Sequence, residues 1–316
     1  MSGASRPVKV IYVAGLGRSG STLLTRLMGQ VEGVCAVGEA HHLWRTGAPR
    51  AATDELCGCG RTYAECGFWP ARLREVFDGD TPLATMESLA DRVARIRRIP
   101  NLLRGGDAEF ERALADYGAV WRRLYGGLAA ATGAEVIFDA SKDLGPLYFL
   151  HRVAGVHVAL VHLVRDPRAV AYSWSRRKLR PEFVGREVWM NTHGPIDAAW
   201  RWLYSNRLAE RAQRLFPDNL TLRYEDFVAE PRATLAEICA LAGVDGADLG
   251  FIDGDRVTLR RTNCTLSGNP MRFDEGTLTV RPDTRWQTDY GRAPRALVSA
   301  LTWPRRWRYG YRGTGG

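Results

Sequence analysis

Residues 10–24, VIYVAGLGRSGSTLL, have the types and spacing of a phosphate-binding turn. They read as a buried strand, a glycine-rich turn and a helix, and the N–H groups of such a turn and helix start attract anions. Gly15 and Gly20 have the separation found in nucleotide triphosphatases, but Ser21 occupies the place of their lysine. Arg18 supplies the cation of the loop, with a charge that does not titrate. The run therefore predicts phosphate binding unlike that of an ATPase, with a plain strand-to-helix connection as the alternative.

A second polar motif follows another apolar strand, in VHLVRDPRAVAYSW at 161–174. Arg165 ends the strand, and Pro167 suits the first position of the next helix. Ser173 then points back toward the strand end, so that Arg165 and Ser173 converge on the carboxyl edge of a parallel sheet. A guanidinium there can bind a phosphate bidentately. The alternative is an ion pair between Arg165 and Asp166.

These two motifs resemble those of sulfotransferases that use 3′-phosphoadenosine 5′-phosphosulfate (PAPS). GLGRSGSTLL resembles their 5′-phosphosulfate loop, and the Arg165 to Ser173 segment resembles their 3′-phosphate motif. The resemblance implies that the 5′-phosphosulfate is bound by Gly17, Arg18, Ser19, Gly20, Ser21 and Thr22, with Arg18 also catalytic. It implies that Arg165 and Ser173 hold the 3′-phosphate.

The resemblance also implies a carboxylate as general base. Glu39, in AVGEAH, aligns with the base of tyrosylprotein sulfotransferases, although Gly38 replaces the first of their two consecutive glutamates. A base is needed because a hydroxyl becomes a nucleophile only as its proton leaves. In this role Glu39 would need partial burial to raise its pKa toward neutrality. His41 and His42 are the competing candidates, since cytosolic members of the superfamily use histidine.

Further positions match the family singly. Lys142, in FDASKDLGP, resembles a lysine of the tyrosylprotein branch and would stabilise charge on the transferring group or protonate the bridging oxygen. An ion pair of Lys142 with Asp139 or Asp143 is the alternative. Tyr224, in LTLRYEDF, matches a segment near the nucleotide, and ordinary packing is the alternative there.

The stretch at 266–286, LSGNPMRFDEGTLTVRPDTRW, resembles the loop that closes over adenosine and the 3′-phosphate. The family's arginine-lysine-glycine triplet is absent from it. Arg272, Arg281 and Arg285 are its cations, and we predict Arg272 as the phosphate ligand.

Three cysteines cluster in LCGCGRTYAECGFW, namely Cys57, Cys59 and Cys66. They could form part of a zinc site with His41 or His42 as fourth ligand, because no fourth cysteine is close in the sequence. Free thiols or a local disulfide are the alternatives. The transfer chemistry itself requires no metal.

Composition is compatible with this interpretation. The chain has 316 residues, 45% of them hydrophobic, and a formal net charge of +9. The charge suits an anionic donor, and the arginines are dispersed rather than gathered in a tail or recognition helix, so we do not expect a nucleic-acid partner. No apolar run is long enough for a membrane span, and no apolar signal core precedes the first strand, so we expect a cytoplasmic protein.

The pattern predicts one domain over 1–316, an α/β fold with a P-loop-type parallel sheet flanked by helices. The expected strands are 8–14, 34–37, 136–138, 157–164 and 220–223. Helices are expected near 86–131, with breaks at Pro100 and at Gly105-Gly106, and near 196–216. A helical, cysteine-containing insertion at about 45–133 is the expected acceptor wall.

The sequence thus favours transfer of a sulfuryl group from PAPS to a hydroxyl of a small molecule, glycan or lipid. A kinase-like phosphotransferase and a non-catalytic binder of the same nucleotide are the alternatives.

Overall fold

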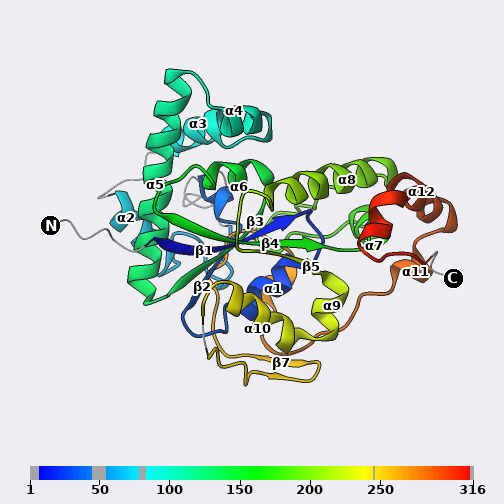
Figure 1. Cartoon of the computed structure of the whole chain (residues 1–316). Helices are drawn as coiled ribbons and strands as arrows, with labels where there is room; N and C mark the ends of the chain where they lie inside the picture. Colours follow the sequence, from blue (N-terminus) through cyan, green and yellow to red (C-terminus); the bar gives the residue numbers. More distant parts are fainter. Residues whose placement is uncertain (1–6, 45–54, 78–82, 245, 314–316) are drawn as a thin grey trace.

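The computed structural model describes residues 7–44, 55–77, 83–244 and 246–313. Its centre is a five-stranded sheet in which every pairing is parallel, in the order β2-β3-β1-β4-β5 (Figure 1). The strands are β1 (Val8–Gly15), β2 (Val34–Gly38), β3 (Val136–Lys142), β4 (Val156–Val164) and β5 (Asn219–Arg223). The α/β fold predicted from the sequence is confirmed, and each strand lies where the apolar runs placed it.

Helices cover both faces of this sheet (Figure 1). Successive side chains of β1 point to opposite faces of the sheet, and a separate hydrophobic core lies on each face. Val10 and Tyr12 pack in the core under α5 (Ala108–Thr132), α6 (Leu144–Leu150) and α8 (Pro195–Ala212). Ile11 and Val13 pack with α1 (Ser21–Met28), α9 (Tyr224–Ala229) and α10 (Pro231–Leu241). Because both faces are buried, the strands β1 and β4 at the centre of the sheet are mostly apolar.

The register of the sheet brings polar side chains to one edge. Ala14 of β1 pairs with Lys142 of β3, and Gly15 pairs with Leu163 of β4. Gly38, the last residue of β2, pairs with Asp139 of β3. The residues that follow these strands therefore start from the same carboxyl edge, where open α/β sheets bind ligands.

The insertion between β2 and β3 is helical. Its elements are α2 (Trp69–Phe77), α3 (Leu83–Val93), η3 (Ile96–Arg98), α4 (Ile99–Arg104) and α5. The predicted break at Pro100 is wrong, because Pro100 lies in the first turn of α4, where proline is tolerated. The break at Gly105 is confirmed, and Asp107 then caps α5 by accepting a hydrogen bond from the N–H of Phe110 at 2.8 Å.

The C-terminal part adds elements that the sequence analysis did not predict. A small antiparallel sheet has the order β6-β7-β8, with β6 (Ile252–Asp253), β7 (Arg256–Leu259) and β8 (Gly276–Thr279). The short η4 (Pro270–Phe273) and α11 (Trp286–Asp289) precede the last helix, α12 (Arg292–Arg308), which packs on α8 and on α7 (Pro167–Ser175). Within the described ranges, no helix combines the length and apolar character needed to cross a membrane.

Candidate active site

A cavity of about 680 Å³ lies at the carboxyl edge of the central sheet. Most of the residues predicted from the sequence line it: Gly17, Arg18, Gly20, Ser21, Thr22, Glu39, Lys142, Arg165, Ser173 and Tyr224. They come from the carboxyl ends of all five strands of the central sheet, from the start of α1 and from α7. The sheet therefore brings together motifs that are far apart in the chain.

The turn after β1 has a conformation that depends on glycine. Gly20 has φ 95°, and a Cβ there would lie 2.4 Å from the ring of Tyr224. Glycine allows both the left-handed backbone and the close contact. Helix α1 starts at Ser21, whose carbonyl accepts a hydrogen bond from the Thr25 hydroxyl at 2.8 Å. The start of α1, with its unpaired N–H groups, thus lies at the cavity.

Arg165 joins the second motif to this turn. Its Nη1 donates a hydrogen bond to the carbonyl oxygen of Arg18 at 3.0 Å, and its guanidinium lies 4.3 Å from the centre of the Tyr224 ring. The predicted alternative, an ion pair with Asp166, is not formed, because Asp166 binds Arg168. The two segments that the sequence analysis expected to meet do so.

The Arg165 side chain retains donor capacity in this place. Its Nε is buried and has no hydrogen-bond partner among the described residues. Asp283 lies 3.7 Å from Nη2, which is a weak contact. Ser173, on the α7 face toward the cavity, is also mostly buried. A buried guanidinium with an unsatisfied N–H fits an anionic ligand such as a phosphate.

Glu39 and Lys142 form an ion pair at the opposite side of the cavity. Their carboxylate and ammonium are in direct contact, with side-chain exposures of 15% and 14%. Burial would raise the pKa of Glu39, but the Lys142 ammonium and His42, 3.3 Å away, outweigh it and hold the pKa well below its usual range. The requirement that burial raise this pKa toward neutrality is thus not met in the free protein, because the opposite charge has the larger effect.

Lys142 therefore does not form the ion pairs with Asp139 or Asp143 considered as its alternative. Asp139 instead accepts hydrogen bonds from the hydroxyl of Tyr125 at 2.6 Å and from the N–H of Ser141 at 2.8 Å. Lys142 has φ 67°, in the left-handed region that is uncommon for lysine. This turn directs the ammonium toward Glu39.

The two histidines after Glu39 have different surroundings. Nε2 of His41 lies 2.7 Å from a carboxylate oxygen of Asp143; burial would lower the pKa of His41, but Asp143 raises it above its usual value. Burial and the neighbouring His41 lower the pKa of His42, which lines the main cavity beside Glu39. His42 is thus the histidine that competes with Glu39 as a base.

Two predicted ligands lie outside the cavity lining. Ser19 is buried within the turn. Arg272 is 1% exposed and donates hydrogen bonds to the carbonyls of Leu56 and Thr265, at 3.1 and 3.4 Å. The choice of Arg272 as the phosphate ligand is not supported by its position, whereas Arg285, another cation of the same stretch, does line the cavity.

The segment 174–193 forms a wall that the sequence analysis missed. It contributes Trp174, Lys178, Arg180, Trp189, Met190, Asn191 and His193 to the cavity. The backbone N–H of Met190 donates to the carbonyl of Lys178 at 2.8 Å, which closes the segment into a hairpin. The basic run SRRKLR at 175–180 was the sequence feature that could have indicated this wall.

The charge of the cavity is strongly positive. Six basic side chains line it, Arg18, Lys142, Arg165, Lys178, Arg180 and Arg285, against two carboxylates, Glu39 and Asp283. Burial lowers the pKa of Arg18 and, with nearby Arg18 and Arg176, that of Lys178. Such a concentration of cations suits a ligand with several negative charges.

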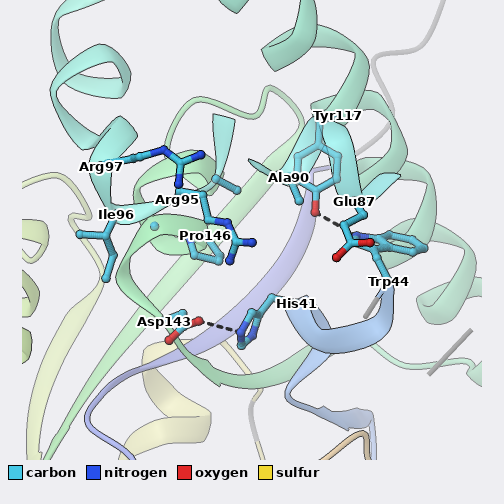
Figure 2. A pocket seen from close by; sticks show the side chains of 12 residues that line it. His41, Trp44, Glu87, Ala90, Arg95, Ile96, Arg97, Tyr117, Asp143 and Pro146 are labelled. Carbon is cyan, nitrogen blue, oxygen red and sulfur yellow. Dashed lines mark hydrogen bonds and ion pairs between the residues drawn. The ribbon is translucent and has the colours of Figure 1, made fainter. Parts of the chain in front are cut away.

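A second cavity, of about 300 Å³, lies between the insertion and α6. Figure 2 shows His41 and Asp143 facing each other on one side of it, with Trp44, Glu87 and Tyr117 across the space. Their neighbours in sequence, His42 and Lys142, line the main cavity. The same two turns therefore separate the two cavities.

The cysteine cluster has a fourth member that the sequence analysis missed. Cys264 lies beside Cys57, Cys59 and Cys66, and the four Sγ atoms are all within 4.8 Å of one another. The expectation that His41 or His42 completes the cluster is wrong, since His41 contacts Asp143 and His42 contacts Glu39.

A comparison with protein families finds a match over the Arg165 to Ser173 motif. The model of the Sulfotransferase family matches residues 150–248, a span that contains Arg165, Ser173 and Tyr224. No curated protein sequence matches the chain significantly. The family match supports sulfuryl transfer as the general class of activity.

Solved sulfotransferase structures are also similar. The sulfotransferase domain of the olefin synthase from Synechococcus PCC 7002 is 19% identical, with a TM-score of 0.49 and coverage of 90% of this chain and 88% of that one. The sulfotransferase domain from the curacin biosynthetic pathway is 17% identical, with a TM-score of 0.48 and coverage of 86% and 85%. A sulfotransferase from Mycobacterium avium is 15% identical, with a TM-score of 0.37 and coverage of 76% and 64%.

Proposed function

We propose that this protein transfers the sulfuryl group of PAPS to a hydroxyl acceptor. The observation that carries the proposal is the contact of Arg165 with the turn after β1, 3.0 Å from its Nη1 to the carbonyl oxygen of Arg18. It places a buried, partly unsatisfied guanidinium beside a phosphate-type turn in one cation-rich cavity. A donor with two separate phosphate groups suits both features, and the family match covers Arg165.

The donor would lie along the cavity between these two anion sites. The N-terminus of α1, with Ser21 and Thr22, would bind the 5′-phosphosulfate through N–H and hydroxyl donors. Arg165 and Ser173 would bind the 3′-phosphate, which ATP lacks. Tyr224, already stacked under the Arg165 guanidinium, would border the nucleotide.

Glu39 and Lys142 would carry out the proton and charge transfers. The acceptor oxygen attacks sulfur as the bond from sulfur to the bridging phosphate oxygen breaks, and the acceptor proton passes to Glu39. Lys142 stabilises the negative charge that develops on the leaving oxygen. When the ammonium turns toward the donor, Glu39 loses its counter-charge and becomes a stronger base. The low pKa of Glu39 in the free protein therefore does not conflict with this role.

The acceptor would enter from the side of the insertion. The cavity in Figure 2 is lined by residues of α3, η3 and α5, and it adjoins the turns that carry Glu39 and Lys142. Trp44 and Tyr117 provide aromatic surface, while Glu87 and Arg97 offer polar contacts. This lining suits a hydroxylated small molecule, glycan or lipid head. We therefore propose that the insertion at about 45–133 is the acceptor wall of a single domain.

Transfer of radiolabelled sulfate from PAPS to components of a metabolite extract tests this function. We expect labelled product with the wild-type protein and at least about a hundredfold less with Glu39→Gln. Arg281→Ala is the matched control, because Arg281 is 76% exposed, pairs with Asp255 and does not line the cavity. Binding of PAPS without product would indicate a non-catalytic binder, and magnesium-dependent turnover of ATP would indicate a phosphotransferase; either result would refute the proposal.

A further inference from the structure

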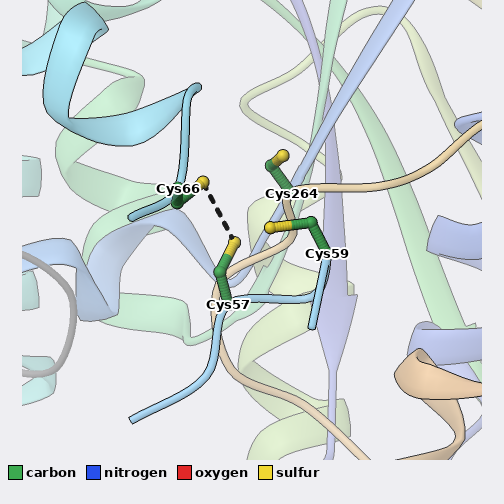
Figure 3. A group of neighbouring side chains, drawn as sticks. All are labelled: Cys57, Cys59, Cys66 and Cys264. Atoms are coloured by element: carbon green, nitrogen blue, oxygen red, sulfur yellow. Dashed lines mark hydrogen bonds between the residues drawn. The ribbon is translucent and has the colours of Figure 1, made fainter. Parts of the chain in front are cut away.

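Four cysteine side chains from two distant parts of the chain lie close together (Figure 3). Cys57, Cys59 and Cys66 come from the insertion, and Cys264 comes from the segment that follows β7. Cys57 and Cys66 are buried, while Cys59 and Cys264 are partly buried. The cluster lies outside the two cavities, so the proposed transfer reaction does not use it.

The spacing of the sulfur atoms matches a tetrahedral metal site. With Zn–S bonds of about 2.3 Å, the sulfurs of a tetrahedral site lie about 3.8 Å apart. Here the Sγ atoms of Cys57 and Cys66 are 3.6 Å apart, and all four lie within 4.8 Å of one another. A disulfide would require about 2.05 Å, and two irons of a cluster would spread the ligands farther. The space suits one ion.

The backbone holds the cysteines in this arrangement through local turns. The N–H of Cys57 donates to the carbonyl of Arg61 at 2.8 Å, and the N–H of Gly60 returns to the carbonyl of Cys57 at 2.9 Å. The N–H of Cys66 donates to the carbonyl of Thr62 at 2.9 Å. Three ligands are thus fixed by one compact loop, independently of the fourth.

The loop and the strand-like segment at Cys264 fit together closely. The N–H of Gly58 donates to the carbonyl of Thr265 at 3.2 Å, and a Cβ at Gly58 would lie 2.6 Å from the side-chain oxygens of Asn263 and Thr265. Glycine between the two cysteines is therefore required for the approach of the two segments. Trp69 adds a hydrogen bond from its Nε1 to the carbonyl of Cys264 at 2.5 Å.

We propose that Cys57, Cys59, Cys66 and Cys264 bind one Zn²⁺ as a structural site. Four thiolates leave no open position for substrate, which is typical of structural rather than catalytic zinc. Four thiolates around Zn²⁺ carry a net negative charge. The buried guanidinium of Arg272 provides nearby positive charge, since it binds the carbonyls of Leu56 and Thr265, the neighbours of Cys57 and Cys264.

The metal would link the insertion to a chain segment that contacts the candidate active site. Leu266 lies two residues after Cys264; its carbonyl accepts the N–H of Glu39 at 2.9 Å, and it forms a bridge to Gly38. Asn269, three residues later, donates its N–H to the hydroxyl of Thr22 at 3.1 Å. The metal would therefore stabilise the segment that contacts both Glu39 and the turn of the donor site.

Metal analysis of the intact protein, purified without chelators, tests the proposal without any transfer assay. We expect about one zinc per chain in the wild type. Cys264→Ser and Cys59→Ser should lose most of it and lower the midpoint of thermal unfolding. Cys239→Ser is the matched control, since Cys239 is a buried thiol of α10 outside the cluster, and it should keep its zinc.

A second measurement covers the case in which the cysteine variants fail to fold. Wild-type protein produced with cobalt should show thiolate-to-cobalt charge-transfer bands and the visible bands of tetrahedral Co²⁺. Wild-type protein with little zinc and no such bands would overturn the proposal. So would a disulfide between Cys57 and Cys66 found by mass spectrometry, or iron as the bound metal. Because zinc content does not depend on PAPS, these outcomes are distinct from failure of the proposed function.

Discussion

Arg165→Ala is the substitution that tests the donor site most directly. Arg165 is 7% exposed, and its guanidinium is held between the Arg18 carbonyl and the Tyr224 ring. A phosphate bound there would lose two charge-assisted hydrogen bonds, each contributing about 1.5–3 kcal/mol. Since water replaces part of this, we expect a loss of about 3 kcal/mol, or roughly a hundredfold weaker binding of adenosine 3′,5′-bisphosphate.

Calorimetric titration with two nucleotides separates the phosphate contact from general damage. AMP lacks the 3′-phosphate, so its affinity should change only by the smaller amount that follows from losing the bond to Arg18. Arg281→Ala, at an exposed arginine outside the cavity, should leave both affinities unchanged. Equal losses for AMP and the bisphosphate would refute the assignment of Arg165 to the 3′-phosphate.

Three further predictions follow from the geometry of the cavity. Glu39→Gln should lower kcat by about 10²–10⁴-fold while changing the bisphosphate affinity little, measured by turnover and calorimetry, and surviving turnover would place the base elsewhere. The pKa of Glu39 is lowered in the free protein, so this base stays deprotonated on mild acidification. We therefore expect no fall of kcat/KM between about pH 7 and pH 5. A fall near pH 6 that disappears in His42→Asn would identify His42 as the base instead. Gly20→Ala should destabilise the protein by about 1–3 kcal/mol in denaturant unfolding, because the new Cβ meets Tyr224 in a strained backbone, and an unchanged midpoint would contradict the described turn.

The sheet and the meeting of the two anion motifs could be predicted from the sequence. Apolar runs placed β1 and β4, and parallel strands share a carboxyl edge, so residues following β1 and β4 were expected at the same edge. The direct pairing of β1 with β4 brings them close together. Arg18 and Arg165 therefore meet as expected. The helix beginning at Pro167 followed from proline's preference for the first helical turn.

What the sequence could not predict depends on contacts between segments far apart in the chain. Cys264 carries no local signal of its partners, because its position beside Cys57 is set by the approach of two loops at Gly58. Arg272 resembles a ligand by its place in the stretch at 266–286, yet its side chain turns into the interior toward Leu56 and Thr265. The direction of a long side chain on an irregular segment follows from tertiary packing.

In the turns after β2 and β3, adjacent side chains face different cavities. His41 and Asp143 face one cavity, while the adjacent His42 and Lys142 face the other. The turns after β2 and β3 lie between the two cavities, and the stretch from α3 through η3, together with Tyr117 of α5, supplies most of the residues that line the cavity beside the insertion. For the proposed transferase, substitutions in this stretch would therefore change which acceptor is bound while leaving the residues proposed to bind the donor unaltered.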